Sequence, residues 1–179
     1  MKQVIVLTGG PGTGKTTVIE LLEQKGFCCY PEISRDIINK AREQGIDQLF
    51  LENPILFSEM LLEGRKKQFI SASEKSEKLI FLDRGLPDVL AYMHYIGDSY
   101  PASFRNICNE HKYSKVFLFP HWEEIYISDN ERYENFEQSK LIYKHLKETY
   151  LDFGYEIIEM PKDTPENRIL FILDEISSN

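Results

Sequence analysis

The sequence predicts a three-layer α/β fold, in which a five-stranded parallel sheet is covered by helices on both faces. Short unbroken apolar runs alternate with segments whose apolar residues recur at helical spacing, as expected for strands joined by crossover helices. The runs lack the polar residue at every second position that marks a strand with one face in water. Strands buried on both faces of a parallel sheet have this pattern.

Five segments have the strand pattern. The first, residues 4–7, is an apolar and mostly β-branched run that ends at glycines, which makes it the best candidate for the central strand. The other four are residues 27–30, 79–82, 116–119 and 155–159.

Helical patterns separate these strands and follow the last one. They cover residues 16–25, 34–43, 54–73, 87–96, 102–111, 135–152 and 164–176. The charged stretch 128–138 has the composition of an exposed element, and we predict a lid near residues 124–140. The alternative for this stretch is the solvated start of a helix.

Composition indicates one domain over residues 1–179, because 42% hydrophobic residues are ample for a single core. The net charge of −8 argues against a nucleic-acid partner, since such binding depends largely on Lys and Arg. The three cysteines lack the spacing of a zinc site or a disulfide framework. No signal peptide or membrane span is evident. We therefore expect a soluble, cytoplasmic protein.

A phosphate-binding motif follows the first predicted strand. Residues 9–16 read Gly-Gly-Pro-Gly-Thr-Gly-Lys-Thr and fit the P-loop pattern G-x-x-x-x-G-K-[ST], placed between a strand and a helix as the motif requires. Its backbone N–H groups can converge on an anion beside the positive end of the helix. Lys15 can reach the outer phosphates, and the Thr16 hydroxyl can bind Mg²⁺. We predict that ATP and Mg²⁺ bind here, through Gly10, Pro11, Gly12, Thr13, Gly14, Lys15, Thr16 and Thr17.

The third strand delivers two charges to the edge of the sheet where α/β proteins bind ligands. Asp83 directly follows residues 79–82 and is a candidate ligand for Mg²⁺, through water. Arg84 is a candidate for binding the acceptor or the transferred phosphoryl group. The alternative is a surface Asp-Arg pair that merely ends the strand.

A second charged group follows the second strand. Glu32 is a candidate base for a substrate hydroxyl, with Arg35 beside it to pair with Glu32 or with a substrate anion. Asp36 and Asp88 are substitutes for the base, and Asp88 is also a candidate substrate residue. The alternative is a helix N-terminus that simply favours acidic residues.

Arg132 lies in the predicted lid and is a candidate cation for closing over the γ-phosphate, with Lys140 on the same segment. The alternative is an ordinary solvated arginine. The predicted catalytic residues are therefore Lys15, Glu32, Arg84 and Arg132.

Together these motifs resemble the AAA-type P-loop ATPase domain family that is related to the kinase domain of ribosylnicotinamide kinases. The resemblance rests on 9–17, 31–35, 83–85 with Asp88 and Tyr92, 116–118, Arg132 with Glu134, Tyr150 with 154–155, and Pro161. It implies a nucleoside-kinase-like P-loop fold with strand order 2-3-1-4-5, ATP and Mg²⁺ as cofactors, an acceptor flanked by Glu32 and Arg84, and a lid near Arg132. Residues 119–122, Phe-Pro-His-Trp, match no substrate-reading motif, so the acceptor stays open.

Two functions fit these observations. The first is a kinase that transfers the γ-phosphoryl group of ATP to a hydroxyl of a small nucleoside-like acceptor. The second is a regulatory ATPase or GTPase switch, in which water is the only acceptor and the bound nucleotide is reported to a protein partner.

Overall fold

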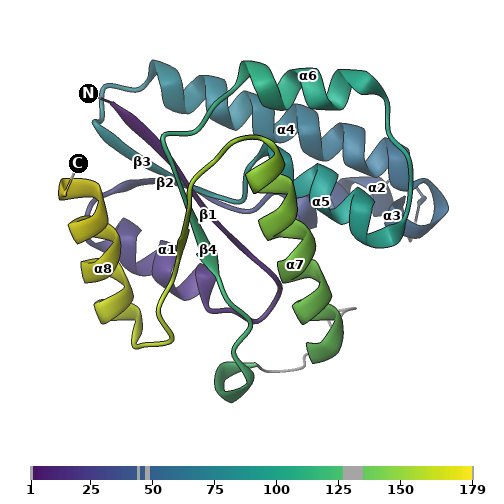
Figure 1. Cartoon of the computed structure of the whole chain (residues 1–179). Helices are drawn as coiled ribbons and strands as arrows, with labels where there is room; N and C mark the ends of the chain where they lie inside the picture. Colours follow the sequence, from purple (N-terminus) through teal and green to yellow (C-terminus); the bar gives the residue numbers. More distant parts are fainter. Residues whose placement is uncertain (1, 44, 47–48, 127–134, 179) are drawn as a thin grey trace.

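The computed structural model describes residues 2–43, 45–46, 49–126 and 135–178, and confirms the three-layer α/β fold (Figure 1). Five parallel strands form one sheet in the predicted order β2-β3-β1-β4-β5. The strands are β1 (Gln3–Gly9), β2 (Cys28–Tyr30), β3 (Leu79–Asp83), β4 (Lys115–Phe119) and β5 (Ile157–Glu159). The first strand is central, as its apolar run predicts.

The seven predicted helices form within one residue of their expected ends. They are α1 (Lys15–Gln24), α2 (Ser34–Glu43), α4 (Pro54–Glu74), α5 (Leu86–Ile96), α6 (Ala102–Glu110), α7 (Phe136–Asp152) and α8 (Pro165–Ser177). Two short elements were not predicted, the helix α3 (Leu49–Glu52) and the 3-10 turn η1 (Glu123–Ile125). Each is under two turns long, too short for an apolar period to appear in the sequence.

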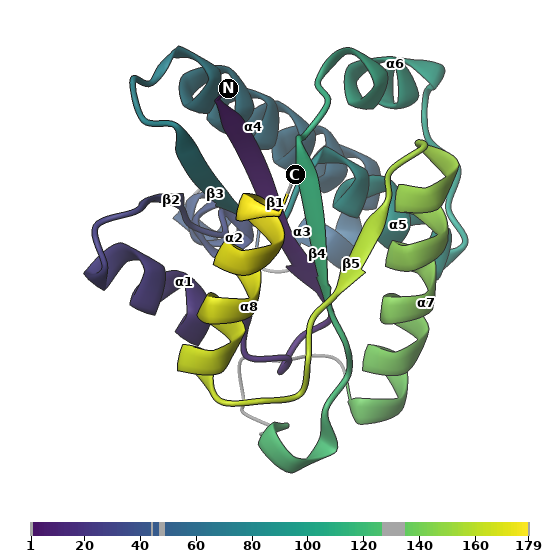
Figure 2. The same ribbon diagram turned by 60° about the vertical axis from the view of Figure 1, so that its left-hand side comes forward.

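Successive strand residues face opposite sides of the sheet, and both sides are buried. One side packs against α1 and α8 through Ile5, Leu7, Phe81, Phe117 and Phe119. The other side packs against helices that include α4, α5 and α7, through Val4, Val6, Ile80, Leu82, Val116 and Leu118. Figure 2 shows α1 and α8 on one side of the strands and α4 to α7 on the other. Burial on both faces explains the unbroken apolar runs.

The parallel register brings the carboxyl ends of the inner strands together. Leu7 pairs with Asp83 across β1 and β3, and Gly9 pairs with Phe119 across β1 and β4. The backbone N–H of Arg84 donates to the Leu7 carbonyl over 2.9 Å. The segments that follow β1, β3 and β4 therefore begin side by side at one edge of the sheet.

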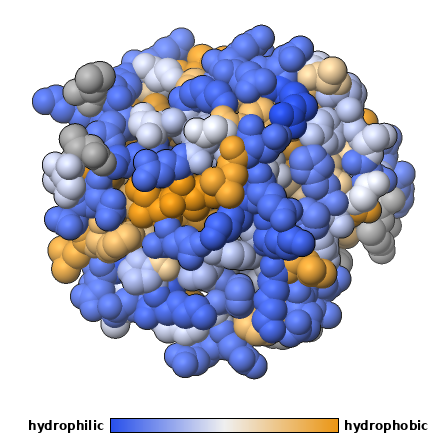
Figure 3. All heavy atoms as spheres, in the orientation of Figure 1, coloured by the Kyte–Doolittle hydropathy of each residue, from blue (hydrophilic) through white to orange (hydrophobic). Residues whose placement is uncertain are grey.

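The face shown in Figure 3 is mainly polar, with hydrophobic residues gathered near its middle. Among the described residues, no helix has the length and apolar character needed to cross a membrane. The three cysteines are free thiols.

Gly9 and Gly26 allow a matched test of the close approach between β1 and β4. Both have positive φ, 154° and 86°, but a Cβ on Gly9 would lie 2.7 Å from the Phe119 carbonyl oxygen, whereas a Cβ on Gly26 would meet nothing within 4 Å. We expect Gly26→Ala to lower the free energy of unfolding by about 1–2 kcal/mol, the cost of a left-handed Ala. Gly9→Ala should lower the free energy of unfolding, measured with urea, clearly more than Gly26→Ala does, because the β4 backbone must move. Equal losses would contradict this.

Candidate functional site

The P-loop, residues 9–16, joins the end of β1 to the start of α1, and its glycines are required by both conformation and space. Gly12 and Gly14 have φ of 70° and 82°, in the left-handed region that favours glycine. A Cβ on Gly10 would lie 2.9 Å from the Ser139 hydroxyl oxygen of α7. The loop is therefore closely packed and has a left-handed backbone at two positions.

Lys15 is a buried cation whose hydrogen-bond partners among the described residues are all neutral. Its ammonium group donates to the carbonyl oxygens of Gly9 and Gly10, over 2.9 and 2.8 Å, and to the Thr13 hydroxyl. Burial, followed by the positive charge of Arg84, lowers the pKa of Lys15 to about 7, although nearby carboxylates act in the opposite direction. A phosphate group here would supply the negative charge that favours protonated Lys15.

A cavity of about 910 Å³ opens above this loop, within the range of small-molecule sites. Its lining follows the strand order of the sheet. Glu32 follows β2, Asp83 and Arg84 end β3, the P-loop follows β1, Trp122 follows β4, and the segment 163–165 with Arg168 follows β5. The P-loop is thus at the centre of the cavity lining. Glu32 and Arg84 lie on one side of it, and Trp122 and Arg168 lie on the other.

Asp83 and Thr16 provide the kind of ligands that Mg²⁺ prefers. Asp83 is the last residue of β3 and is 5% exposed, and its Oδ1 has no hydrogen-bond partner among the described residues. Burial raises the pKa of Asp83, while Lys15 acts in the opposite direction. Thr16 lines the same cavity and is exposed. Because Mg²⁺ usually takes one or two protein ligands plus waters and phosphates, these residues fit it.

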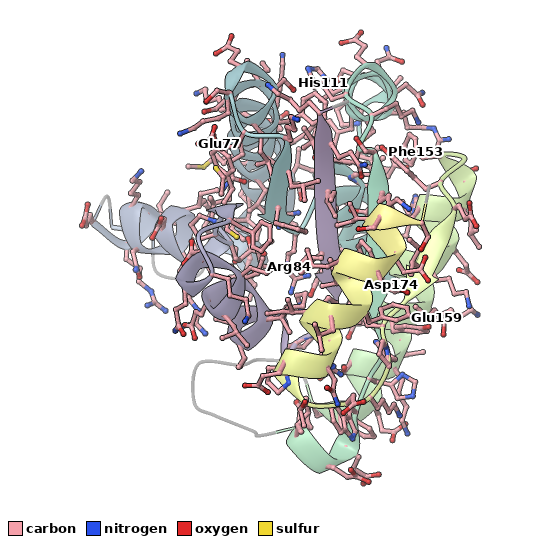
Figure 4. All side chains as sticks on the ribbon, turned by 90° about the vertical axis from the view of Figure 1, so that its left-hand side faces the viewer. Glu77, Arg84, His111, Phe153, Glu159 and Asp174 are labelled. Carbon is pink, nitrogen blue, oxygen red and sulfur yellow. The ribbon has the colours of Figure 1, made fainter. Side chains whose placement is uncertain are left out.

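Glu32 forms the centre of an ionic cluster with two arginines. Its Oε2 lies 2.5 Å from Nε of Arg84, and both oxygens accept from Nη2 of Arg65, over 3.1 and 3.2 Å. Burial raises the pKa of Glu32, but Arg65 and Arg84 outweigh this effect and lower it to about 2. Arg84 lies at the edge of the sheet, toward α1, in Figure 4. The structure therefore brings together two candidate site residues, Glu32 and Arg84, which the resemblance placed on either side of an acceptor.

Arg65 is the part of this cluster that the sequence analysis missed. It lies in α4, is 3% exposed, and also donates to the Gly85 carbonyl over 3.2 Å. The sequence did contain a signal for Arg65. It follows Leu61 by four residues and Leu62 by three, so helical periodicity places it on the buried side of α4. A charged residue on the buried side of a helix requires a buried partner.

Asp88 lies behind the cavity wall rather than in its lining. It is fully buried in α5, and its carboxylate accepts from the hydroxyls of Thr8 and Tyr150, both over 2.6 Å, and from the Gly85 N–H. Nη1 of Arg84 lies 3.5 Å from its Oδ1. Through these contacts Asp88 holds the turn between β3 and α5.

The remaining predicted residues are less closely associated with the cluster. Arg35 is exposed at the start of α2 and lines the cavity, whereas Asp36 lines a separate groove between α2 and α4. Lys140 forms an exposed ion pair with Glu137 over 2.7 Å. Arg132 and the part of the predicted lid from 127 to 134 lie outside the described residues.

A P-loop at the carboxyl end of a central parallel strand, with an acidic residue ending the neighbouring strand, defines the class of P-loop nucleotide-binding domains. A family model described as "AAA domain" matches residues 4–168, and the chain belongs to this family. No curated protein matches the sequence.

Solved structures with the same fold include nucleoside and nucleotide kinases. A deoxyadenosine kinase from M. mycoides with bound dATP gives a TM-score of 0.71 at 18% identity, covering 97% of this chain and 99% of the other. Thymidylate kinase from Ehrlichia chaffeensis gives 0.64 at 15% identity, with 98% of each chain covered. A NadR protein in complex with NR gives a TM-score of 0.75 at 18% identity. The match covers 97% of this chain but only 51% of the NadR chain.

At these identities the similarity establishes the shared fold. With the family match, it confirms the predicted resemblance and the strand order that the resemblance implied.

The role of Asp88 can be tested by its effect on stability. We expect Asp88→Asn to lower the free energy of unfolding by about 2–4 kcal/mol, because the amide cannot accept from all three buried donors. The matched control is Asp98→Asn, at an exposed position, with an effect within about 0.5 kcal/mol. Unchanged stability of Asp88→Asn together with lost acceptor binding would instead place Asp88 at the substrate.

The pH dependence of stability tests the Glu32 cluster. The pKa of Glu32 falls from its ordinary value of 4.5 to about 2 on folding, so its ion pairs stabilise the protein above pH 4.5. This contribution is lost as the pH falls from 4.5 toward 2. We expect the free energy of unfolding of the wild type to exceed that of Glu32→Gln by on the order of 2 kcal/mol near neutral pH. The difference should be smaller by about pH 3. Glu110→Gln, at an exposed site, is the control, and a pH-independent difference would contradict the cluster.

Proposed function

We propose that this chain is a kinase that transfers the γ-phosphoryl group of ATP, bound with Mg²⁺, to a hydroxyl of a nucleoside-like small molecule. The products are ADP and a phosphate monoester, and the hydroxyl proton leaves through a base. The observation that carries the proposal is the Glu32–Arg84 pair, which lines the same cavity as the P-loop, on the β2 and β3 side.

This pair provides what phosphoryl transfer to a hydroxyl requires beyond nucleotide binding. Phosphoryl transfer depends on positioning and on stabilising charge at the transferred group, with a carboxylate to accept the hydroxyl proton. Glu32 is the carboxylate and Arg84 the cation. Lys15 stabilises the outer phosphates from the cradle.

Arg84 also explains how Glu32 becomes a base. While both arginines contact the carboxylate, its pKa of about 2 keeps it charged but weakly basic. If Arg84 turns to the oxygens of the transferred group, Glu32 loses one of its two cationic partners and its pKa rises. Arg65, donating to both Glu32 oxygens and to the Gly85 carbonyl, holds the carboxylate in place during this change.

Several further features belong to this proposal. Thr16 and Asp83 hold Mg²⁺, which balances charge on the β- and γ-phosphates when bound. Arg35 contacts the acceptor from the exposed side of the cavity, and Arg132 acts from a lid near residues 124–140. We propose a single cytoplasmic domain over residues 1–179. The deoxyadenosine kinase structure with bound dATP and the NadR structure in complex with NR support a nucleoside or riboside as the acceptor class.

A panel of nucleosides, ribosides and sugars incubated with MgATP tests the reaction class. We expect ADP formation to rise at least tenfold with one acceptor class over the rate with water alone, and the phosphorylated acceptor to appear in equal amount. ADP release at the same slow rate with every acceptor would instead support a regulatory NTPase. Replacing ATP with GTP under the same conditions measures the donor preference.

With the acceptor known, Glu32→Gln tests the base. We expect kcat to fall by at least about a hundredfold while ATP affinity changes little, because the amide keeps the size of Glu32 but cannot take the proton. The control Glu110→Gln, at an exposed position on α6, should match the wild type. An unchanged transfer rate in Glu32→Gln would remove Glu32 from the mechanism.

A further inference from the structure

Arg168, in the first turn of α8, is buried against the P-loop from the side opposite the Glu32 cluster. It is 2% exposed, and its Nη1 donates to the Thr13 carbonyl over 2.9 Å. A Cβ on Gly14 would lie 2.9 Å from the same Nη1. One side chain, 155 positions away from Thr13 in the sequence, thus contacts two consecutive residues of the loop.

The other contacts of Arg168 hold its guanidinium group at a fixed angle. Nε donates to the Pro161 carbonyl over 2.9 Å, in the segment that follows β5. The guanidinium carbon lies 5.3 Å from the ring centre of Phe119 and 4.8 Å from that of Trp122, at the end of β4. The segments after β1, β4 and β5 therefore all contact one planar guanidinium group. Its N–H donors point in different directions, so it can bind the carbonyls of Thr13 and Pro161 at the same time.

Within the described ranges, no salt bridge balances the charge of Arg168. Among the described residues, no carboxylate oxygen lies within 4 Å of its guanidinium group, and its buried Nη2 has no hydrogen-bond partner. Burial lowers the pKa of Arg168, while Asp163 acts in the opposite direction. A buried cation with only neutral partners is costly for folding alone. Such a cost is expected where an anion binds nearby, and the phosphate cradle is adjacent.

The bond to Thr13 also orients the next peptide group. In a trans peptide the carbonyl oxygen and the following N–H point in opposite directions. The Thr13 carbonyl is held toward Arg168, so the N–H of Gly14 is directed to the opposite side of the loop. An N–H that faces a bound phosphate forms a charge-assisted hydrogen bond.

We propose that Arg168 is a positioning residue for the nucleotide: by holding the Thr13 carbonyl, it keeps the Gly14 N–H turned toward the bound phosphates. This inference rests on the proposed function, since it assumes that the cradle binds a nucleotide. It adds a role for α8, which the P-loop motif does not include.

The test compares Arg168→Met with Arg168→Lys in calorimetric titrations with Mg²⁺ and the ATP analogue AMP-PNP. We expect Arg168→Met to bind about tenfold or more weakly, the effect of one lost charge-assisted hydrogen bond. Lysine keeps one donor but not the planar guanidinium group, so Arg168→Lys should lie between Met and wild type. Arg105→Met is the matched control, because Arg105 lies on α6, does not line the cavity and pairs with Asp152 of α7.

Kinetics separate this role from general damage. We expect the KM for ATP to rise in both variants while the KM for the acceptor stays near the wild-type value. If Arg168→Met does not fold, Arg168→Lys alone carries the test. Wild-type AMP-PNP affinity in a folded Arg168→Met, or an equal loss of affinity for both substrates, overturns the role of Arg168. Absence of nucleotide binding by the wild-type chain overturns the proposed function itself, and this inference with it.

Discussion

The ionic contacts of Glu32 are the constraint on which the acceptor side of the cavity depends. Glu32 follows β2, Arg65 belongs to α4 and Arg84 follows β3, so three elements meet at one carboxylate. Each arginine also contacts the turn after β3: Arg65 bonds to the Gly85 carbonyl, and Arg84 lies beside Asp88. Removing Glu32 leaves both arginines without their shared carboxylate, whereas removing either arginine leaves Glu32 with only the other one.

This cluster also accounts for the unusual backbone of Arg84. Its φ is 71°, in the left-handed region, which costs a residue with a side chain about 1–2 kcal/mol. The contacts that offset this cost are its N–H bond to Leu7, its ion pair with Glu32 and its position 5.4 Å from the ring centre of Tyr92. Strain of this kind is found where function requires a particular side-chain direction. Here the left-handed turn directs Arg84 to Glu32 and the cavity instead of continuing the line of β3.

Local signals predicted the fold well, whereas contacts between distant segments could not be predicted. Each of the informative patterns spans only a few residues: the apolar runs of β1, β3 and β4, and the P-loop motif. The sequence alone therefore predicted these strands and the P-loop. The roles of Arg65 and Arg168 depend on partners 33 and 155 positions away. No local pattern specifies which buried carboxylate or carbonyl such a side chain will meet. Asp88 was only partly predictable. The sequence indicated it as a candidate site residue, but only the structure revealed its buried hydroxyl partners, Thr8 and Tyr150.

The distribution of charge explains how an acidic chain can bind a polyanion. The net charge is −8, yet the cations Lys15, Arg84 and Arg168 line the cavity around the P-loop and are buried or nearly so. Surface charges are screened by water and salt over about 10 Å, whereas buried charges near a ligand act through a medium of lower dielectric constant. The local field at the cradle therefore depends on these buried groups more than on the exposed carboxylates. Within the described part of the chain, Lys15 and Arg168 have only neutral hydrogen-bond partners, so their charges remain available to a phosphate. The charge of Arg84 is instead shared with Glu32.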